Sequence, residues 1–109
     1  MTDAAAVLGA FFAAEDARDW ETYRSFLHPD VEWVLGDRVI RGIDRYVEAM
    51  QAAYGDDDVR FRCEWSHVSE SGSLVAALLV DDAGRRSLDV SEFKDGLVWK
   101  EHEFLPGRT

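Results

Sequence analysis

The sequence predicts an α+β fold in which three N-terminal helices pack on one face of a strongly curved, mainly antiparallel sheet. Two patterns along the chain predict it. Up to residue 54, apolar residues recur mostly at intervals of three and four, the spacing of amphipathic helices. From Val59 onward, apolar and polar residues alternate, which is the period of a strand. Helices gathered early and strands gathered late are typical of helices segregated to one face of an antiparallel sheet.

Composition limits the classes of protein to consider. The chain has 109 residues, 47% of them hydrophobic, and we expect one folded domain over residues 1–109. A formal charge of −10 repels phosphate backbones and disfavours nucleic-acid binding. No stretch is long enough to cross a bilayer, and the first residues lack the basic start of a secretion signal. We therefore expect a cytoplasmic protein that contacts neither nucleic acid nor membrane.

Several cofactor and nucleophile motifs are missing from the sequence. It contains no glycine-rich phosphate loop, no Cys/His zinc spacing and no Gly-x-Ser-x-Gly elbow. Cys63, the single cysteine, lies inside an apparent strand, where we expect a packed thiol and not a nucleophile. The sequence predicts no cofactor and no metal site.

The first two helices are expected before residue 29. Thr2 or Asp3 can cap the first, which should end near Ala17. Asp19 can cap the second, which should stop at His28-Pro29 because the residue before proline disfavours the helical conformation. Their apolar faces consist of Val7, Leu8, Phe11 and Phe12 in the first helix and of Trp20, Tyr23, Phe26 and Leu27 in the second.

Two short strands, Val31–Leu35 and Val39–Ile40, are expected next, joined by a turn at Gly36-Asp37. A third helix should open at Gly42 and stop at Gly55. Its apolar residues fall at helical spacing: Ile43, Tyr46, Val47, Met50 and Tyr54.

Four long antiparallel strands should complete the sheet. Residues 59–67 alternate between apolar and polar, and residues 74–80 are apolar on both faces, as in a central strand. The last two strands form a hairpin over residues 88–105 around Asp95-Gly96, a strong turn signal. This hairpin carries acidic side chains among apolar ones.

Three segments in this order carry a family resemblance: FLHPDVEW at 26–33, VIRGIDRYVEAM at 39–50 and FKDGLVWKEHEFL at 93–105. Together they resemble the nuclear transport factor 2-like superfamily, specifically its SnoaL-like members, over nearly the whole chain. The resemblance implies a cone-shaped, barrel-like α+β fold that wraps a pocket for a small hydrophobic ligand, and homodimers paired through the sheet. The family includes polyketide cyclases, ketosteroid isomerases, limonene epoxide hydrolases, dehydratases and non-catalytic ligand-binding or assembly domains, so fold alone does not settle function.

The resemblance also suggests roles for single residues. Asp89 matches the oxyanion-hole acid of ketosteroid isomerases, but their general base would fall near Trp33 or Leu35 and their first-helix tyrosine near Phe11. Steroid isomerisation by that mechanism is therefore not expected.

The match to limonene epoxide hydrolases is similarly incomplete. Glu103 falls at the place of their last-strand catalytic aspartate, and Asp81 falls near the second acid. Leu79 stands where the arginine should be. Epoxide hydrolysis is weakened by this departure but stays open.

The register of the last hairpin decides where its acids point. A three-residue turn, Lys94-Asp95-Gly96, would pair Asp89 with Glu101 and leave Glu103 on the same face. A two-residue Asp95-Gly96 turn would instead set Asp89 opposite His102. The family resemblance favours the first arrangement, with Asp89, Trp99, Glu101 and Glu103 lining the cone.

Carboxylates crowded into a pocket of low dielectric cannot all ionise easily, so at least one pKa should rise towards neutrality. We hypothesise that Asp89 and Glu103 form an acid/base pair, tuned by Glu101, that acts on a small apolar molecule with a carbonyl, hydroxyl or epoxide. The alternative is a structural network in which these acids face solvent or pair with Arg38, Arg41, Arg60 or Arg62.

Aromatic residues could supply the wall of the ligand site, although aromatic residues at periodic positions also commonly form core. The candidates for ligand contact are Phe11, Trp33, Tyr46, Tyr54, Trp65 and Trp99. The sequence thus predicts a small-molecule-binding protein, with cofactor-free acid/base catalysis or a non-catalytic ligand-binding or dimerisation role as alternatives.

Overall fold

A computed structural model describes residues 3–108. Their elements are α1 (Ala4–Asp16), α2 (Trp20–Ser25), β1 (Leu27–Leu35), β2 (Arg38–Arg41), α3 (Ile43–Tyr54), β3 (Phe61–Val68), β4 (Leu74–Asp81), β5 (Arg85–Lys94) and β6 (Leu97–Arg108). The strands form one six-stranded open sheet in the order β2-β1-β6-β5-β4-β3. Only β1 and β6 pair in parallel; every other neighbouring pair is antiparallel.

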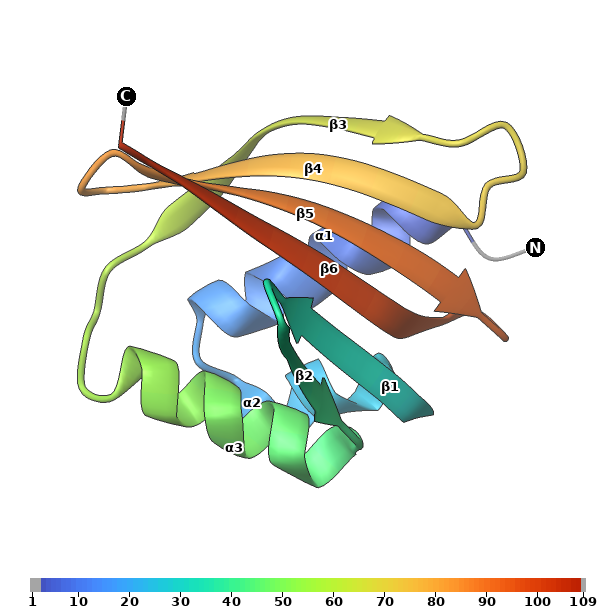
Figure 1. Ribbon diagram of the computed structural model, residues 1–109, viewed down its shortest axis with the longest axis horizontal. Coiled ribbons are helices and arrows are strands. Elements are labelled where there is room, and N and C mark those ends of the chain that lie inside the picture. The colour runs from blue at the N-terminus through green and yellow to red at the C-terminus, as the bar shows by residue number, and fades with distance from the viewer. Residues whose placement is uncertain (1–2, 109) are drawn as a thin grey trace.

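Helices and sheet form two layers, which confirms the predicted α+β cone. The long strands β3 to β6 arch over the helices, and α1 crosses behind β5 and β6 (Figure 1). On the opposite side, α3 lies against β1 and β2. The core fills the space between them and includes buried Leu8, Phe11, Tyr23, Val31 and Val75.

The first helix begins at Ala4, directly after Asp3, one of its two predicted caps. Asp3 caps it, because its carboxylate accepts from the backbone N–H groups of Ala5 at 3.0 Å and Ala6 at 3.4 Å. Thr2, the other candidate cap, lies outside the described residues. The helix ends at Asp16, one residue before the expected end.

The second helix is shorter than predicted. It ends at Ser25, and His28 and Pro29 already belong to β1. The Phe26 carbonyl accepts a hydrogen bond from Val98 N–H at 2.8 Å, and Leu27 pairs with Val98 in the sheet. Pairing with β6 therefore adds to the helix-breaking effect of the X-Pro bond and converts the expected end of the helix into strand.

The third helix follows the prediction closely. It runs from Ile43 to Tyr54. The flanking Gly42 and Gly55 have φ angles of 90° and 55°, a region in which glycine avoids the strain of a side chain.

The strand expected at residues 59–67 is also displaced, because β3 begins at Phe61. Its pairing with β4 shifts between Cys63 and Trp65, so the simple alternation read from the sequence breaks there. Since β3 is an edge strand, Cys63 is exposed, and the expectation of a packed thiol was wrong.

Neither predicted register of the last hairpin is correct throughout. The turn has two residues: Lys94 pairs with Leu97, and Asp95 and Gly96 both have positive φ, as in a type I′ turn. Trp99 is then an extra, bulged residue on β6, which shifts the pairing beyond it by one residue. As a result, Asp89 faces Glu103 across the strands.

Beyond this bulge, Ser91 pairs with Glu101. The predicted pairings of Asp89 with Glu101 and with His102 are therefore both wrong, although Asp89, Glu101 and Glu103 do share one face.

No helix within residues 3–108 has the length and apolar character needed to span a bilayer.

Candidate functional site

A cavity of about 390 Å³ lies between the helices and the inner face of the sheet. This volume falls within the usual range of small-molecule sites. Its apolar wall includes Tyr23, Trp33, Tyr46, Met50, Tyr54 and Leu79. Polar residues that line the same space include Glu15, Ser87, Asp89, Glu101 and Glu103.

Ser87 links two of the predicted catalytic acids. Its Oγ lies 2.6 Å from Asp89 Oδ1 and 2.9 Å from Glu103 Oε2. A hydroxyl has one hydrogen and can donate to only one of these oxygens. The other short contact is favourable only if that carboxyl carries a proton and donates it to Ser87. The geometry therefore fits an Asp89 and Glu103 pair that holds at least one proton.

Glu101 continues the row of polar side chains formed by Glu103, Ser87 and Asp89. It is buried, with only 3% of its surface exposed. Ser91 Oγ donates to Glu101 Oε2 at 2.6 Å. The Glu101 side chain lowers the pKa of Asp89, whereas Asp89 raises that of Glu101, so Glu101 holds a proton more readily than Asp89. Burial, and then the neighbouring Asp89 charge, raises the pKa of Glu101 well above its ordinary value.

Asp89 is the central member of the row. Burial, and then the nearby Glu103 carboxylate, raises the pKa of Asp89 to about 7. Glu103 is held from the other side, where Trp33 Nε1–H donates to Glu103 Oε1 at 3.0 Å. These contacts give the two carboxyls unlike surroundings, which is the condition for separate acid and base roles.

Glu15 on α1 is a fourth carboxyl of the site, and the sequence patterns did not predict it. Glu15 is 9% exposed, and the Tyr54 hydroxyl donates to its Oε2 atom. Burial, together with the charges of Asp89 and Glu103, raises the pKa of Glu15 to about 8. The available signal was its position four residues after Phe11, which places an acid on the apolar face of the helix.

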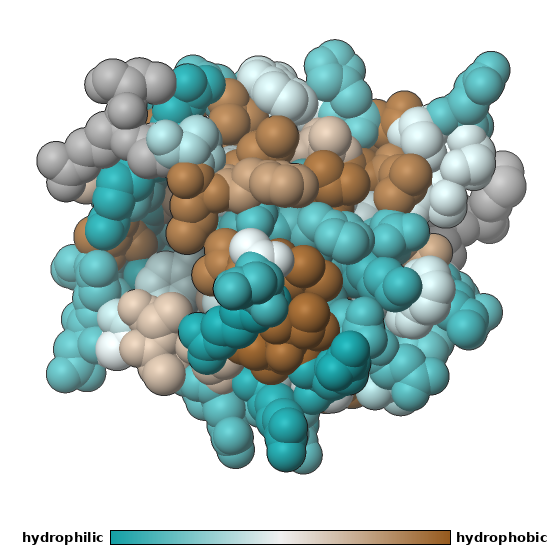
Figure 2. Space-filling view, viewed as in Figure 1, coloured by the Kyte–Doolittle hydropathy of each residue, from teal (hydrophilic) through white to brown (hydrophobic). Residues whose placement is uncertain are grey.

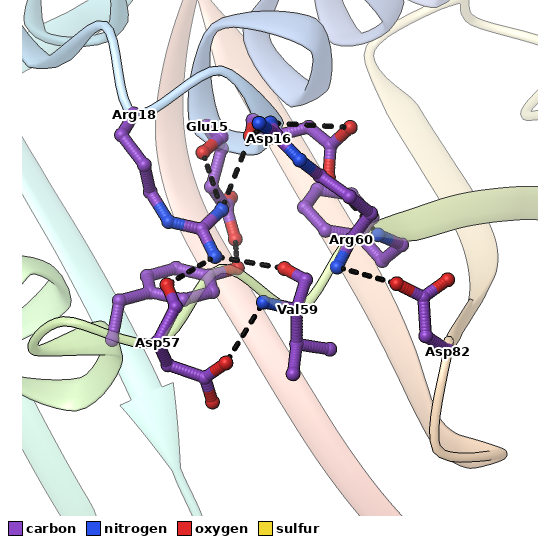
Figure 3. Close-up of polar contacts among 9 residues, drawn as sticks. Glu15, Asp16, Arg18, Asp57, Val59, Arg60 and Asp82 are labelled. Atoms are coloured by element: carbon purple, nitrogen blue, oxygen red, sulfur yellow. Dashed lines mark hydrogen bonds and ion pairs between the residues drawn. The ribbon is translucent and has the colours of Figure 1, made fainter.

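Arg18 fixes the edge of the cavity beside Glu15, as Figure 3 shows. Its guanidinium lies 3.8 Å from the centroid of the Tyr54 ring. It donates to the carbonyl oxygens of Asp57 at 3.0 Å and Val59 at 2.7 Å, and to two carbonyls at the end of α1. Arg18 thereby ties α1 to the loop between α3 and β3.

The predicted arginine network around the acids is wrong. Arg41 pairs with Glu32 at 2.9 Å, and Arg60 lies 3.9 Å from Asp16. Among the side chains that the structure describes, those of residues 3–106, no arginine or lysine forms an ion pair with Glu15, Asp89, Glu101 or Glu103.

Three of the six aromatic residues predicted to contact a ligand line the cavity, and three do not. Trp33, Tyr46 and Tyr54 line the cavity. Phe11 lies behind the wall, stacked on Tyr23 with ring centroids 4.2 Å apart. The remaining two, Trp65 and Trp99, lie elsewhere.

Trp65 sits on the outer face of the sheet with 42% of its surface exposed. Trp99 occupies the bulge, between the ammonium groups of Lys94 at 5.1 Å and Lys100 at 4.5 Å from its ring centroid. The prediction that Trp99 lines the cone was wrong, because the bulge removes it from the inner row.

Metal ligation has a separate geometric requirement. Across the described part of the chain, no group of three or more His, Cys, Asp or Glu side chains is placed to hold a metal ion.

The fold and this site define a cone-shaped α+β protein with an acid-lined cavity at its centre. The chain belongs to the SnoaL-like domain family, whose model matches residues 8–101. No curated protein matches the sequence.

Solved structures of the same fold include a ketosteroid isomerase-like protein from Kribbella flavida, with 23% identity and a TM-score of 0.85 over 95% of this chain and 78% of that one. A SnoaL-like protein from Burkholderia thailandensis is 19% identical, with a TM-score of 0.84 over 95% of each chain. An LEH-like epoxide hydrolase from M. tuberculosis is 20% identical, with a TM-score of 0.78 over 94% of this chain and 82% of that one.

Proposed function

We propose that this protein binds a small, largely apolar molecule in the cavity and acts on its carbonyl, hydroxyl or epoxide by general acid–base catalysis, without a cofactor. The observation that carries the proposal is the Ser87 bridge between Asp89 and Glu103 in a cavity with apolar and aromatic side chains in its wall. Such a pair can hold one proton near neutral pH and pass it to, or accept it from, a bound molecule.

Each acid has a distinct proposed role. Asp89 is the proton donor, because its raised pKa keeps it largely protonated up to about pH 7. Glu103 is the base, oriented by the indole N–H of Trp33. Glu101 tunes Asp89 from the buried side and does not itself need to reach the substrate.

The reaction class is proton transfer, with isomerisation, cyclisation, dehydration and epoxide opening as its candidate outcomes. Trp33 and Leu35 supply no base from β1, which disfavours the steroid isomerase mechanism. Asp81, the counterpart of the second hydrolase acid, is bound by Arg85 at 2.8 Å and forms no hydrogen bond with Ser87, Asp89 or Glu103. A single acid/base pair on β5 and β6 therefore supports the proposal best.

The test uses three probe substrates: a cyclic enone, an allylic tertiary alcohol and a terpene epoxide, with products followed by gas chromatography and mass spectrometry. We expect turnover of at least one probe, and a loss of about 100-fold or more in Asp89→Asn and in Glu103→Gln. Glu64→Gln, an exposed acid on β3, is the matched control and should retain full turnover.

Full turnover in both site variants would refute the acid/base assignment. If the wild type binds probes that quench the fluorescence of Trp33 but converts none, the non-catalytic ligand-binding alternative is the correct one.

We also propose a homodimer paired through the outer face of the sheet. Trp65, Leu78, Leu88 and Phe104 stand opposite one another across β3, β4, β5 and β6. Phe104 is 56% exposed, and Figure 2 shows apolar side chains gathered over these strands in the upper half of the view. Leu78 is only 5% exposed, but Trp65 and Phe104 leave apolar surface on this face, and exposed apolar surface of this kind often marks a protein interface.

The oligomeric state tests this second proposal. Light scattering after size-exclusion chromatography should give twice the monomer mass for the wild type and the monomer mass for Phe104→Glu. Val39→Glu introduces the same charge at an exposed apolar residue of β2 and should leave the dimer intact. A monomeric wild type at micromolar concentration would contradict the proposal. The cytoplasmic location and the lack of nucleic-acid partners stay predictions.

A further inference from the structure

The cavity gathers four carboxyls, none of which forms an ion pair with a described basic side chain. Glu15 enters from α1, Asp89 from β5, and Glu101 and Glu103 from β6. Arg18 donates to main-chain carbonyls, Arg85 pairs with Asp81, and Arg86 lines the cavity without an ion pair to any of the four acids. Burying several carboxyls together without a cation is unfavourable unless they hold protons or a ligand supplies the positive charge.

A second, independent feature also lacks a partner in the cavity wall. Tyr23 lines the cavity, its side chain is fully buried, and its Oη atom has no hydrogen-bond partner among the described residues. The neighbouring Tyr46 phenol adds to the effect of burial in raising the pKa of Tyr23, but the two hydroxyls do not meet the geometry of a hydrogen bond. Because buried polar atoms are normally satisfied, this oxygen is a place where a bound donor would fit.

We propose that the ligand of this cavity is a protonated amine with an apolar body, whose ammonium group is received by Glu15, Asp89 and Glu103. An ammonium group offers three donors and no acceptor, which matches a site rich in carboxyl oxygens with a free phenol oxygen nearby. This inference rests on the proposed function only in using the same cavity, and it specifies the chemical class of the molecule bound there.

Aromatic side chains of the wall suit the same ligand. Trp33 and Tyr46 line the cavity with ring centroids 5.5 Å apart. Cations are attracted to the faces of such rings, and the Arg18 guanidinium already lies over one face of Tyr54. Met50 and Leu79 provide apolar surface for the body of the molecule.

The sign of the pH dependence separates an amine from a neutral ligand. Burial raises the pKa of Glu15 to about 8 and that of Asp89 to about 7, so both are largely protonated in the empty cavity below these values. An ammonium ligand displaces such protons and binds more tightly as the pH rises. A neutral acceptor, such as a ketone, takes a hydrogen bond from the protonated acid and binds more weakly as the pH rises.

Other charged groups around the cavity contribute to this balance. They are Arg18, Asp57 and Asp81 with its partner Arg85, and Arg86 at the rim. The phenols of Tyr46 and Tyr54 stay neutral across the range, because burial raises the pKa of each well above its ordinary value.

Three probes that differ in one group test the inference: 2-naphthylmethylamine, 2-naphthylmethanol and 2-naphthoate. Binding is measured by titration calorimetry at pH 5.5, 6.5 and 7.5. We expect the amine to bind at least tenfold more tightly than the alcohol at pH 7.5. Its affinity should rise by up to about tenfold per pH unit for each proton displaced, and the carboxylate should not bind.

Single-residue variants test which side chains bind the ammonium group. Glu15→Gln and Glu103→Gln should each weaken the amine at least tenfold and the alcohol by less than threefold. Tyr23→Phe should weaken the amine severalfold without lowering the melting temperature, because the hydroxyl it removes has no partner in the free protein. Glu64→Gln, on the outside of the molecule, should change neither affinity.

Two results would overturn the inference. If the alcohol binds as tightly as the amine, or if the affinity for the amine falls as the pH rises, the site does not select a cation, and the proposed acid/base function is unaffected. If none of the three probes binds at any pH, both the amine inference and the small-molecule part of the proposed function are wrong.

Discussion

The two faces of the last hairpin differ in the opposite sense from an ordinary antiparallel sheet. Half-exposed sheets usually place apolar residues inside and polar residues outside. Here Asp89 and Glu101 are buried on the inner face, whereas Leu88 and Phe104 stand on the outer face. The inner face therefore carries buried acids, which lower the stability of the fold, and the outer face carries apolar side chains whose burial would raise it. Both departures point to partners: a ligand inside and, in our proposal, a second chain outside.

The bulge at Trp99 sets which side chains of β6 face inward and which face outward. Removing the bulge should therefore have the largest effect on folding. Deletion of Trp99 would slip the rest of β6 by one residue and turn Phe104 inward and Glu103 outward. We expect the cooperative urea transition, followed by circular dichroism, to be lost. Trp99→Ala keeps the residue count and should retain the transition. Equal unfolding curves for the deletion and the wild type would show that the bulge does not set the register.

The pH dependence of stability should be the next largest effect. Burial raises the pKa values of Glu15, Asp89 and Glu101, so the folded state holds protons that the unfolded state has released. Stability is then highest near pH 5 and falls as the pH rises towards 8, by up to about 1.4 kcal/mol per pH unit for each proton.

Glu101→Gln sharpens this prediction, because the amide keeps the shape of the side chain and cannot ionise. Urea unfolding at pH 5.5 and pH 8 should show a smaller difference in the variant than in the wild type, and a more stable variant at pH 8. A wild type that gains stability over this range would contradict the burial of protonated acids.

Ser87→Ala should have the smallest effect of the three. It removes the hydroxyl between Asp89 and Glu103, and we expect a loss of about 1 kcal/mol in the free energy of unfolding. Ser66→Ala, at an exposed position on β3, is the control and should lie within about 0.5 kcal/mol of the wild type. An equal loss in both variants would show that the bridge does not stabilise the protein.

Sequence patterns predicted the architecture well, because amphipathic periods and turn residues are local signals. The common face of Asp89, Glu101 and Glu103 was also predicted, but through a three-residue turn that does not exist. The two-residue turn and the bulge at Trp99 compensate for each other, and a bulge depends on pairing across strands that no local motif announces.

Glu15 was missed for a related reason. A single acid on an apolar helical face is usually taken as its solvent edge, and only the tertiary contact with Tyr54 shows that it is buried. The end of α2 was misplaced because the hydrogen bond that recruits Phe26 to the sheet comes from Val98, far along the chain.

The anchoring of the α3–β3 loop by Arg18 has a consequence for how this cavity can change. All the loop oxygens that Arg18 holds belong to the main chain, those of Asp57 and Val59. The Val59 side chain lines the cavity and takes no part in this anchor, so its exchange can alter ligand preference while the scaffold is kept. Asp57 is less suitable for exchange, because its Oδ1 atom accepts a hydrogen bond from Val59 N–H at 2.8 Å.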